Sequence, residues 1–385
     1  MATGPTLIQH LPERHVPLAA SLAWAAKKRG ISRWRIGFDI VQRLLGRQKL
    51  TPDEYFMFGL HRGDLTNAER DAFVGQSAVA ALNKALLGGP RRALGDLLND
   101  KVKMAMVLER AALPTTQILA IYVPHGAPGP WPVLRNAAEI AAYLLTPGHL
   151  PLFGKPVAGS RSVGVMSIVA AHGDHVELGD GRRVAALGLA QEIVAGFANG
   201  YLFQELLRPH PEIERLSGPA VASLRVFTLW QDQAAVPLYV MIKLPGKGAM
   251  ADDFGAGAAN TAAMVDMATG KITRAHFAAN LGGTTVDTSA VTGAPLLGAV
   301  IPQIEAVLHL ARQAHAMFAE HGAIGTDIVL TDRGPVINEL NSNPLQGNFQ
   351  RASGFGLFSP AFRPLFLAAL AAKGINQRQR GLPLP

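Results

Sequence analysis

The sequence contains no cysteine among its 385 residues. This absence excludes disulfides and thiolate metal sites and fits a reducing compartment, so we expect a cytoplasmic protein. The sequence also lacks a run of about 18 apolar residues free of charge and proline, which predicts that no segment spans a membrane. The opening stretch, MATGPTLIQHLPERHVP, has no basic head followed by an apolar core. We therefore expect no secretory signal.

Charged residues are few, at 17% of the chain, and their balance is uneven. The net charge of +8 arises within residues 14–49, where the only acid is Asp39. The nine basic residues of this segment are Arg14, Lys27, Lys28, Arg29, Arg33, Arg35, Arg43, Arg47 and Lys49. Such a face can attract an anionic glycan, nucleic acid or lipid headgroups, and the alternative is a solvated helix face. Peripheral contact with an anionic surface is thus one interpretation of residues 14–49, and we expect no specific nucleic-acid partner.

Apolar residues recur at helical spacing within this basic segment. Trp34, Phe38, Val41 and Leu45 fall on one face of a helix with 3.6 residues per turn. The spacing predicts an amphipathic helix that docks on the body of the protein.

Helix start signals continue after this segment. Thr51, Pro52 and Glu54 follow the capping-box pattern, with proline at the first helical position, and Thr66 and Glu69 repeat it. We interpret residues 1–95 as a basic, mostly helical N-terminal region.

From about residue 96 the pattern mixes strands with helices. We predict helices at 99–113, 136–145, 186–197, 297–320 and 358–373, and strands at 117–123, 151–157, 163–171, 200–207, 222–230, 236–244, 262–275 (a pair) and 325–344 (a hairpin). A further hairpin is predicted to turn at Asp180 and Gly181. Strand-rich lobes mixed with helices predict an α+β fold rather than a doubly wound sheet.

A loop rich in small residues lies in the stretch LFGKPVAGSRSVGVMSI, residues 152–168. Loops of this kind often close their backbone N–H groups on an anion. Three familiar motifs nearly match and fail. Pro156 stands where a P-loop needs serine or threonine, GSRSVG lacks the middle glycine of a dinucleotide fingerprint, and SRSVG lacks the first glycine that a nucleophilic Ser162 would need. The loop alone is compatible with a phosphate cradle or with a plain hairpin turn.

A stronger signal is the segment GTDIVLTDRGPVINELNSNP near the C-terminus. Glu339 and Asn341 are two residues apart, so in a strand they point to the same face. A tight turn can bring Asp327 opposite them. Two carboxylates and one amide are hard oxygen ligands that suit Mg²⁺ shared with a substrate phosphate. The alternative is a pair of exposed acids on an amphipathic hairpin.

A third element is GYLFQELLRPHPEIERL, an apolar strand followed by a proline-rich turn. An extended segment of this kind can read an adenine edge with its backbone N–H and C=O groups. Alternatively, Glu205 is a strand acid with a salt-bridge partner.

Taken in this order, the elements resemble the ATP-grasp superfamily, the fold of D-alanine–D-alanine ligase and glutathione synthetase. NDKVKMAMVLERAALPTT, GKPVAGSRSVGV, FQELL, SLRVFTL and DIVLTDRGPVINELNSNP carry the likeness from about Asn99 to Asn343. KLTPDEYFMFGLH and KLPGKGAMADDFGAGA resemble the sugar-transfer-associated group, which is related to α-L-glutamate ligases. The resemblance implies two α+β lobes that grip ATP over residues 96–385, a hinge near 204–207, and an N-terminal helical extension.

The resemblance also implies roles for individual residues. ATP would be bound by Lys101, Lys155, Gly159, Ser160, Ser162, Gly164, Gln204, Glu205, Leu207 and Glu212, with His210 as an alternative to Glu212 at the ribose. Asp327, Glu339 and Asn341 would hold Mg²⁺. The catalytic residues would be Arg225, Lys155 and Lys243, of which Lys243 and the nearby Asp253 would lie toward the acceptor.

The activity implied is an ATP-dependent carboxylate–amine ligase that works through an acyl phosphate, with a small-molecule, glycan or peptide acceptor and a link to surface-polysaccharide synthesis. Two alternatives use the same nucleotide site. One is a phosphotransferase that acts on a hydroxyl group. The other is a nucleotide-binding accessory protein of a glycan assembly complex.

Overall fold

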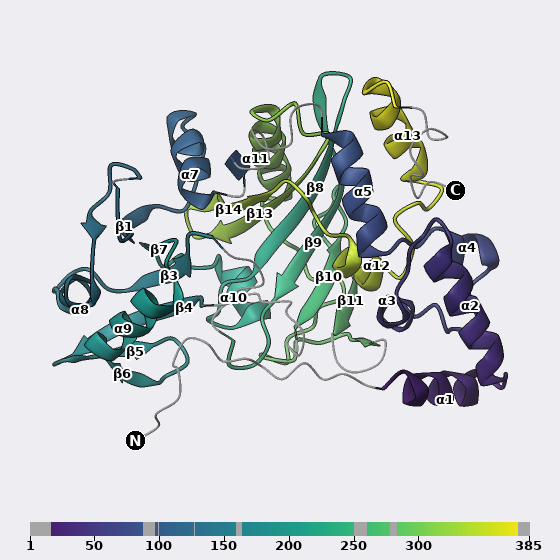
Figure 1. The fold of residues 1–385 in the computed structure, drawn as a ribbon, viewed down its shortest axis with the longest axis horizontal. Helices are drawn as coiled ribbons and strands as arrows, with labels where there is room; N and C mark the ends of the chain where they lie inside the picture. Colours follow the sequence, from purple (N-terminus) through teal and green to yellow (C-terminus); the bar gives the residue numbers. More distant parts are fainter. Residues whose placement is uncertain are drawn as a thin grey trace.

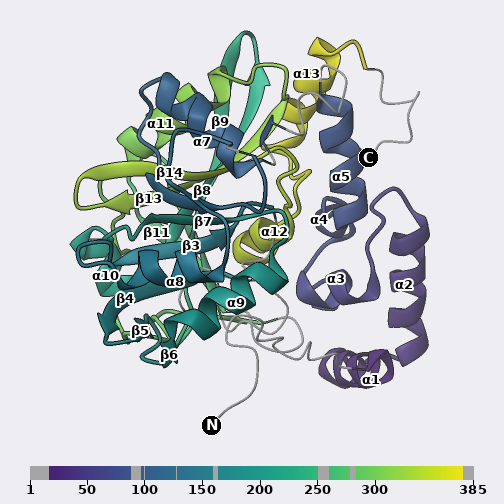
Figure 2. The same cartoon turned by 60° about the vertical axis from the view of Figure 1, so that its left-hand side comes forward.

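The structure is a computed structural model, and it describes residues 17–87, 97–98, 100–126, 128–158, 164–249, 260–277 and 283–375. It contains two seven-stranded sheets with helices packed against them, and a group of helices at one outer edge (Figures 1 and 2). No helix in the described residues is both long and apolar enough to cross a bilayer.

The helices at the outer edge come first in the chain. They are α1 (Leu18–Arg29), α2 (Arg33–Leu45), α3 (Pro52–Met57), α4 (Asn67–Asp71) and α5 (Gln76–Leu86). Both predicted capping boxes form, since Thr51 and Thr66 each accept a hydrogen bond from the backbone N–H of a glutamate that bonds back to the cap. The boundary near residue 95 stays a prediction, because residues 88–96 lie outside the described part of the chain.

The predicted apolar stripe of α2 faces solvent instead of the body of the protein. Ile36, Ile40 and Arg43 face the protein interior instead, and Ile36 and Ile40 join a core with residues of α1 and α3. Trp34 is 89% exposed, Phe38 65% and Leu45 73%, so the predicted docking stripe faces solvent. The prediction was wrong because the opposite face of α2 carries a second apolar pair, Ile36 and Ile40, together with the ion pairs of Arg43, and apolar spacing does not tell which face is buried.

The first sheet has the strand order β2-β1-β7-β3-β4-β5-β6. Its strands are β1 (Ile118–Tyr122), β2 (Val133–Leu134), β3 (Leu152–Pro156), β4 (Met166–His172), β5 (His175–Leu178), β6 (Arg183–Ala185) and β7 (Tyr201–Glu205). Helices α8 (Ala137–Leu145) and α9 (Ala186–Gly196) pack on it. Ile140, Leu144, Leu189 and Ile193 recur four residues apart and turn inward, where they contact the sheet.

The second sheet is antiparallel, with the order β12-β11-β10-β9-β8-β13-β14. Its strands are β8 (Ser223–Gln231), β9 (Ala234–Leu244), β10 (Thr261–Val265), β11 (Ile272–Phe277), β12 (Thr284–Thr285), β13 (Ala323–Thr331) and β14 (Gly334–Asn341). One face packs on α7 (Lys101–Arg110), α10 (Pro211–Ser217) and α11 (Ile304–Ala316), and the opposite face on α5, α12 (Gly347–Ser353) and α13 (Arg363–Ala372).

The predicted ranges 297–320 and 358–373 are longer than the helices observed there. α11 begins at Ile304 rather than near Leu297, because Pro302 precedes Gln303, whose backbone is left-handed at φ 54°. α13 (Arg363–Ala372) begins five residues after the start of the predicted range 358–373 and ends one residue before its end.

The N-terminal helices are joined to α12 by one buried side chain. The Gln350 amide nitrogen donates to the Val74 carbonyl at 2.8 Å, and its amide oxygen accepts from the Val74 N–H at 2.9 Å. The same oxygen accepts from the Leu357 N–H at 3.2 Å.

Replacing Gln350 by alanine should therefore lower the free energy of unfolding by about 2–4 kcal/mol, because buried backbone groups lose their partners. Urea unfolding followed by circular dichroism measures this change. Gln76→Ala, at an exposed position on α5, is the matched control and should change the free energy by less than about 0.5 kcal/mol. Equal stabilities of the two variants would contradict the assignment.

Candidate active site

The candidate site begins as a row of charged residues across three strands of the second sheet. Arg225 on β8 lies opposite Asp327 on β13, and Asp327 lies opposite Glu339 on β14. Directly opposed residues of an antiparallel pair project from the same face. The hairpin geometry predicted from the sequence is therefore confirmed, and Asn341 follows two residues after Glu339 on the same strand. Figure 1 shows β9, β8, β13 and β14 side by side at the centre of the molecule.

Asp327 is the best-connected member of the row. Its carboxylate accepts two hydrogen bonds from the Arg225 guanidinium, through Nε and through Nη2, the latter at 2.8 Å. Lys243 Nζ, from β9, donates to the same carboxylate at 3.2 Å. Burial alone would raise the pKa of Asp327, but the charges and hydrogen bonds of Arg225 and Lys243 outweigh it and lower the pKa to about 2. The carboxylate is thus charged at every physiological pH.

Gly325, two residues before Asp327 on β13, makes room for this ion pair. A Cβ atom on Gly325 would lie 3.2 Å from Arg225 Cδ and 2.9 Å from Pro344 Cβ. These approaches are closer than ordinary contacts, so a side chain at this position would displace the guanidinium or the segment after β14.

Glu339 and Asn341 are the oxygen ligands that remain available for a cation. Within the described residues, no side chain or backbone group donates a hydrogen bond to the half-buried Glu339 carboxylate. Asn341 donates its amide nitrogen to the Gly325 carbonyl at 3.4 Å, which leaves the amide oxygen as an acceptor. By donor chemistry, these residues fit Mg²⁺. Asp327 differs from the prediction in one respect, because both its oxygens already bond to cationic side chains.

A β-bulge directs one more residue of the hairpin toward the first sheet. Asp327 pairs with Glu339 and the next residue, Ile328, pairs with Ile337, so Asn338 is the extra residue of β14. Its amide oxygen accepts a hydrogen bond from Lys155 Nζ at 3.2 Å. Lys155 lies on β3 of the first sheet and is only 6% exposed. The predicted nucleotide lysine and the predicted metal hairpin therefore meet, and sequence reasoning missed Asn338 because a bulge has no simple sequence signature.

At the predicted hinge, a second contact joins the first sheet to the second sheet. Glu205, at the end of β7, accepts from the backbone N–H of Gln117 at 3.1 Å and pairs with Arg333 Nη2 at 2.7 Å. Arg333 lies at the turn between β13 and β14. This is the arrangement of the alternative interpretation, in which Glu205 is a strand acid with a salt-bridge partner.

Gln204 and Leu207 flank this acid. Gln204 is 4% exposed, and its amide oxygen has no hydrogen-bond partner among the described residues. A buried acceptor without a partner is costly, so it marks a position where a bound group with an N–H, such as the adenine amino group, fits. Leu207 is buried against Val329 and Val336 of the hairpin. The structure thus brings Leu207 against the second sheet at the hinge, while Gln204 lies on β7 between β1 and β3 of the first sheet.

Two further predicted residues bond within their own helix. Glu212 lies in the first turn of α10, where its carboxylate pairs with Arg215 at 3.1 Å. His210 caps the same helix by accepting from the Glu212 N–H at 3.2 Å. Both side chains are engaged within α10 itself. Lys101 is the first residue of α7, next to the N-cap Asp100, and is half-buried.

Of the four ATP-binding residues predicted in the small-residue loop, Gly164 alone is described, while Gly159, Ser160, Ser162 and the acceptor-side Asp253 lie outside the described residues. Gly164 has φ +77°, and a Cβ there would lie 2.2 Å from the Phe197 ring. Its carbonyl accepts a hydrogen bond from the Tyr201 hydroxyl at 2.7 Å. Only glycine fits this position, for both conformational and steric reasons.

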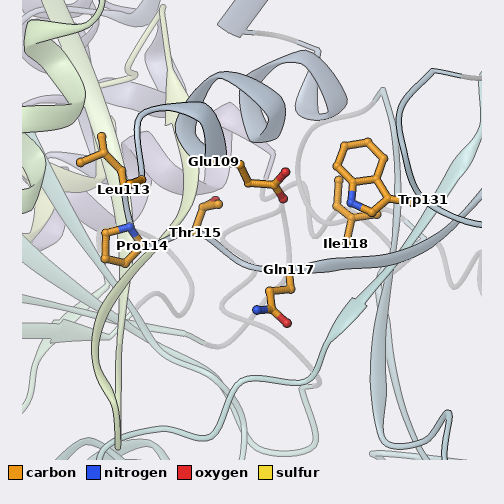
Figure 3. A pocket seen from close by; sticks show the side chains of 8 residues that line it. Glu109, Leu113, Pro114, Thr115, Gln117, Ile118 and Trp131 are labelled. Atoms are coloured by element: carbon orange, nitrogen blue, oxygen red, sulfur yellow. The ribbon is translucent and has the colours of Figure 1, made fainter.

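A pocket of about 500 Å³ lies beside the hinge, where α7 leads into β1 (Figure 3). It is lined by Glu109, Ala112, Leu113, Pro114, Thr115, Gln117, Ile118 and Trp131. Gln117 links it to Glu205 through the backbone hydrogen bond described above. It contains none of the predicted site residues, so the site is defined by the facing side chains of the two sheets rather than by this pocket.

The fold and the facing lysine and carboxylate hairpin place the protein among ATP-grasp proteins. More particularly, the chain belongs to the sugar-transfer associated ATP-grasp family, whose sequence pattern matches residues 90–362, more than half of the chain. No curated protein matches this chain in sequence.

Several solved structures resemble parts of this chain at low sequence identity. D-alanyl-alanine synthetase A from Vibrio cholerae is 14% identical, with a TM-score of 0.41 over 72% of this chain and 66% of its own. D-alanine–D-alanine ligase from Bacillus anthracis is 12% identical, with a TM-score of 0.38 over 72% and 69%. The biotin carboxylase domain of Hydrogenobacter thermophilus 2-oxoglutarate carboxylase, in complex with MgADP and bicarbonate, is 14% identical, with a TM-score of 0.35 over 64% and 40%. This chain thus spans less than two thirds of the first and last of these, and similarity at this level says nothing about substrate.

The buried ion pairs of Asp327 generate a prediction about stability. Because the pKa is depressed in the folded state, the carboxylate stabilises the fold above its unfolded pKa of about 4, and this contribution is lost as pH falls through about 2. Asp327→Asn should lower the free energy of unfolding by about 3–5 kcal/mol at neutral pH, since it leaves two buried cations without a counter-ion.

Urea unfolding at a series of pH values measures the difference between wild type and variant. The difference should shrink between about pH 4 and pH 2. Asp287→Asn, which changes an exposed carboxylate, is the matched control. A gap that stays constant down to pH 2 would show that the charge of Asp327 does not stabilise the fold.

Proposed function

We propose that the protein is an ATP-dependent ligase that joins a carboxylate to an amine or a related nucleophile. The observation that supports this most directly is the meeting of Lys155 and the carboxylate hairpin between the two sheets, beside the cations Arg225 and Lys243. Phosphoryl transfer spreads negative charge over the transferred group, so it requires positioned cations more than a covalent nucleophile. A location in the cytoplasm, where ATP is abundant, goes with this proposal.

Each side chain has a physical task in the proposed reaction. Lys155 would bind nucleotide phosphate, and Glu339 and Asn341 would hold Mg²⁺ through oxygen atoms. Asp327 would act chiefly by holding Arg225 and Lys243 in place, since it bonds to both. When bound, ATP with Mg²⁺ supplies a phosphoryl group that turns the carboxylate into an acyl phosphate with a good leaving group. Attack of the amine on the acyl carbon then breaks the bond to the phosphate oxygen and releases inorganic phosphate.

The adenine would lie at the hinge. Gln204 offers a buried acceptor that lacks a partner among the described residues, and Leu207 offers an apolar surface. Glu205 would keep the hinge in register through Arg333 rather than contact the base. Family membership supports a role in surface-polysaccharide or peptide-conjugate synthesis, and the acceptor would approach from the side of Lys243.

The proposal is tested with a coupled assay for ADP release against a panel of amino acids, amino sugars and peptides. A ligase releases inorganic phosphate only when an amine is present. Release of ADP with transfer of phosphate to a hydroxyl acceptor would instead identify a phosphotransferase. No turnover with any acceptor would leave an accessory nucleotide-binding role as the better explanation.

Changing Glu339 to glutamine should reduce ATP turnover by about a hundredfold or more, because the site loses a charged metal ligand. The melting temperature should stay close to wild type, since no described residue donates a hydrogen bond to this carboxylate. Glu214→Gln, an exposed acid on α10, is the matched control. Unchanged turnover in Glu339→Gln would remove this residue from the site.

Lys155→Met keeps most of the buried side chain while removing its charge. We expect the affinity for ATP to fall by about tenfold or more, measured by titration calorimetry, because a buried cation facing phosphate is lost. Lys84→Met, at an exposed position of α5, controls for loss of a positive charge. If both variants bind ATP as tightly as wild type, Lys155 does not contact the nucleotide.

A further inference from the structure

The outer face of α1 and α2 is unusually apolar for a solvent-exposed surface. Of the twelve large apolar side chains exposed in the described residues, seven lie on these two helices, and five of the seven lie on α2. Four of them, Trp34, Phe38, Val41 and Leu45, follow one another at offsets of four, three and four along α2. We call these four residues the α2 stripe.

The orientation of the α2 stripe is fixed by the opposite side of the helix. Ile36 and Ile40 are buried in a core with residues of α1 and α3. Arg43 is also buried, and its guanidinium pairs with Asp39 at 3.0 Å and with Asp71 at 2.9 Å. Rotating α2 to bury the stripe would break these ion pairs and expose the aliphatic core. The stripe therefore faces outward as part of the folded state.

Exposed basic residues lie on both helices. Lys27, Lys28, Arg33 and Arg35 are all exposed, and Arg33 and Arg35 stand on either side of Trp34 in the sequence. The only acid within residues 17–49 is Asp39, and it is turned inward. Its carboxylate accepts hydrogen bonds from Arg43, Arg70 and Tyr55. Apart from Asp39, neither helix carries an acid of its own, and Asp71 on α4 is engaged by the buried Arg43.

The combination of an exposed apolar stripe and basic side chains favours some binding partners for this face over others. A helix with an apolar face, basic flanks and an exposed tryptophan is suited to lie in the interface of a bilayer. A second copy of the chain would bring basic flanks against basic flanks, which repel. Figures 1 and 2 show α1 and α2 at one outer edge of the molecule, away from the first sheet, so a broad flat surface can approach them.

We propose that the outer face of α1 and α2 docks on the surface of an anionic lipid bilayer. The α2 stripe inserts at the level of the lipid headgroups, and the basic side chains contact headgroup phosphates. The docking is peripheral, and it explains why the net positive charge of the protein is concentrated in this segment. It does not depend on the proposed ligase activity.

The test is cosedimentation of the full chain with vesicles at low salt. Vesicles of phosphatidylcholine containing about one third phosphatidylglycerol should bind the protein, and vesicles of phosphatidylcholine alone should bind it about tenfold or more weakly. Binding should fall at about 0.5 M salt, where charges are screened within a few Å. Binding should also shift the tryptophan emission to the blue, because Trp34 leaves water.

Two pairs of variants separate the apolar and electrostatic contributions. Trp34→Ser with Phe38→Ser should lower the partition coefficient by about tenfold or more and abolish the blue shift. Leu187→Ser with Leu297→Ser, two exposed apolar residues elsewhere, should leave both unchanged. Arg33→Gln with Arg35→Gln should lower partitioning by about tenfold, while Lys84→Gln with Lys271→Gln should not.

Thermal unfolding of each variant confirms that the exposed substitutions leave the fold intact. Failure of the wild-type chain to bind the anionic vesicles at low salt would overturn the proposal, as would equal binding to neutral vesicles. A concentration-dependent dimer that is lost in Trp34→Ser with Phe38→Ser, without vesicle binding, would assign the face to a second copy instead. Loss of ATP turnover in the panel assay bears on the proposed function alone.

Discussion

The bidentate pairing of Arg225 with Asp327 is the interaction on which the candidate site depends. It joins β8 to β13 on the face where Lys243 and Glu339 also project. A buried carboxylate is unfavourable alone, and so are two buried cations, but each offsets the desolvation of the others. One consequence is that the cationic side chains of Arg225 and Lys243 are held in position near the hairpin before a ligand binds. Preorganised charge of this kind needs little rearrangement when a charged group binds.

Much of the site could be predicted from the sequence because it follows from strand periodicity. In DIVLTDRGPVINELN, the tight turn brings Asp327 next to the strand that carries Glu339 and Asn341, and the two-residue repeat puts these two on one face. The direct opposition of Asp327 and Glu339 also needs the bulge at Asn338, because the register near the turn alone would place Asp327 opposite Asn338. The capping boxes at Thr51 and Thr66 could also be predicted from the sequence, because the sequence pattern and the hydrogen bonds that it predicts lie within one helical turn. The family likeness added the lysine strand and the hinge, which no local pattern alone could have connected to the hairpin.

The features that the sequence did not predict all depend on long-range partners. Asn338 reaches Lys155 only because of a bulge, and the pairing of Glu205 with Arg333 joins residues far apart in the chain. The predicted buried face of α2 was wrong for the same reason. Helical spacing identifies an apolar stripe, but whether it turns inward is decided by the neighbours of the opposite face, here the acids around Arg43.

Two of the links between the two sheets near the site are polar, and they lie beside the apolar contact of Leu207 with Val329 and Val336. Lys155 with Asn338 and Glu205 with Arg333 are contacts that water can replace at small net cost in free energy. The sheets themselves are held to their helices by buried aliphatic and aromatic side chains. Separation of β3 from β14 would therefore break polar contacts at this point. Helix α7, which packs Val102 and Ala105 on the first sheet and Met104 and Leu108 on the second, would keep the two sheets joined at its end of the seam.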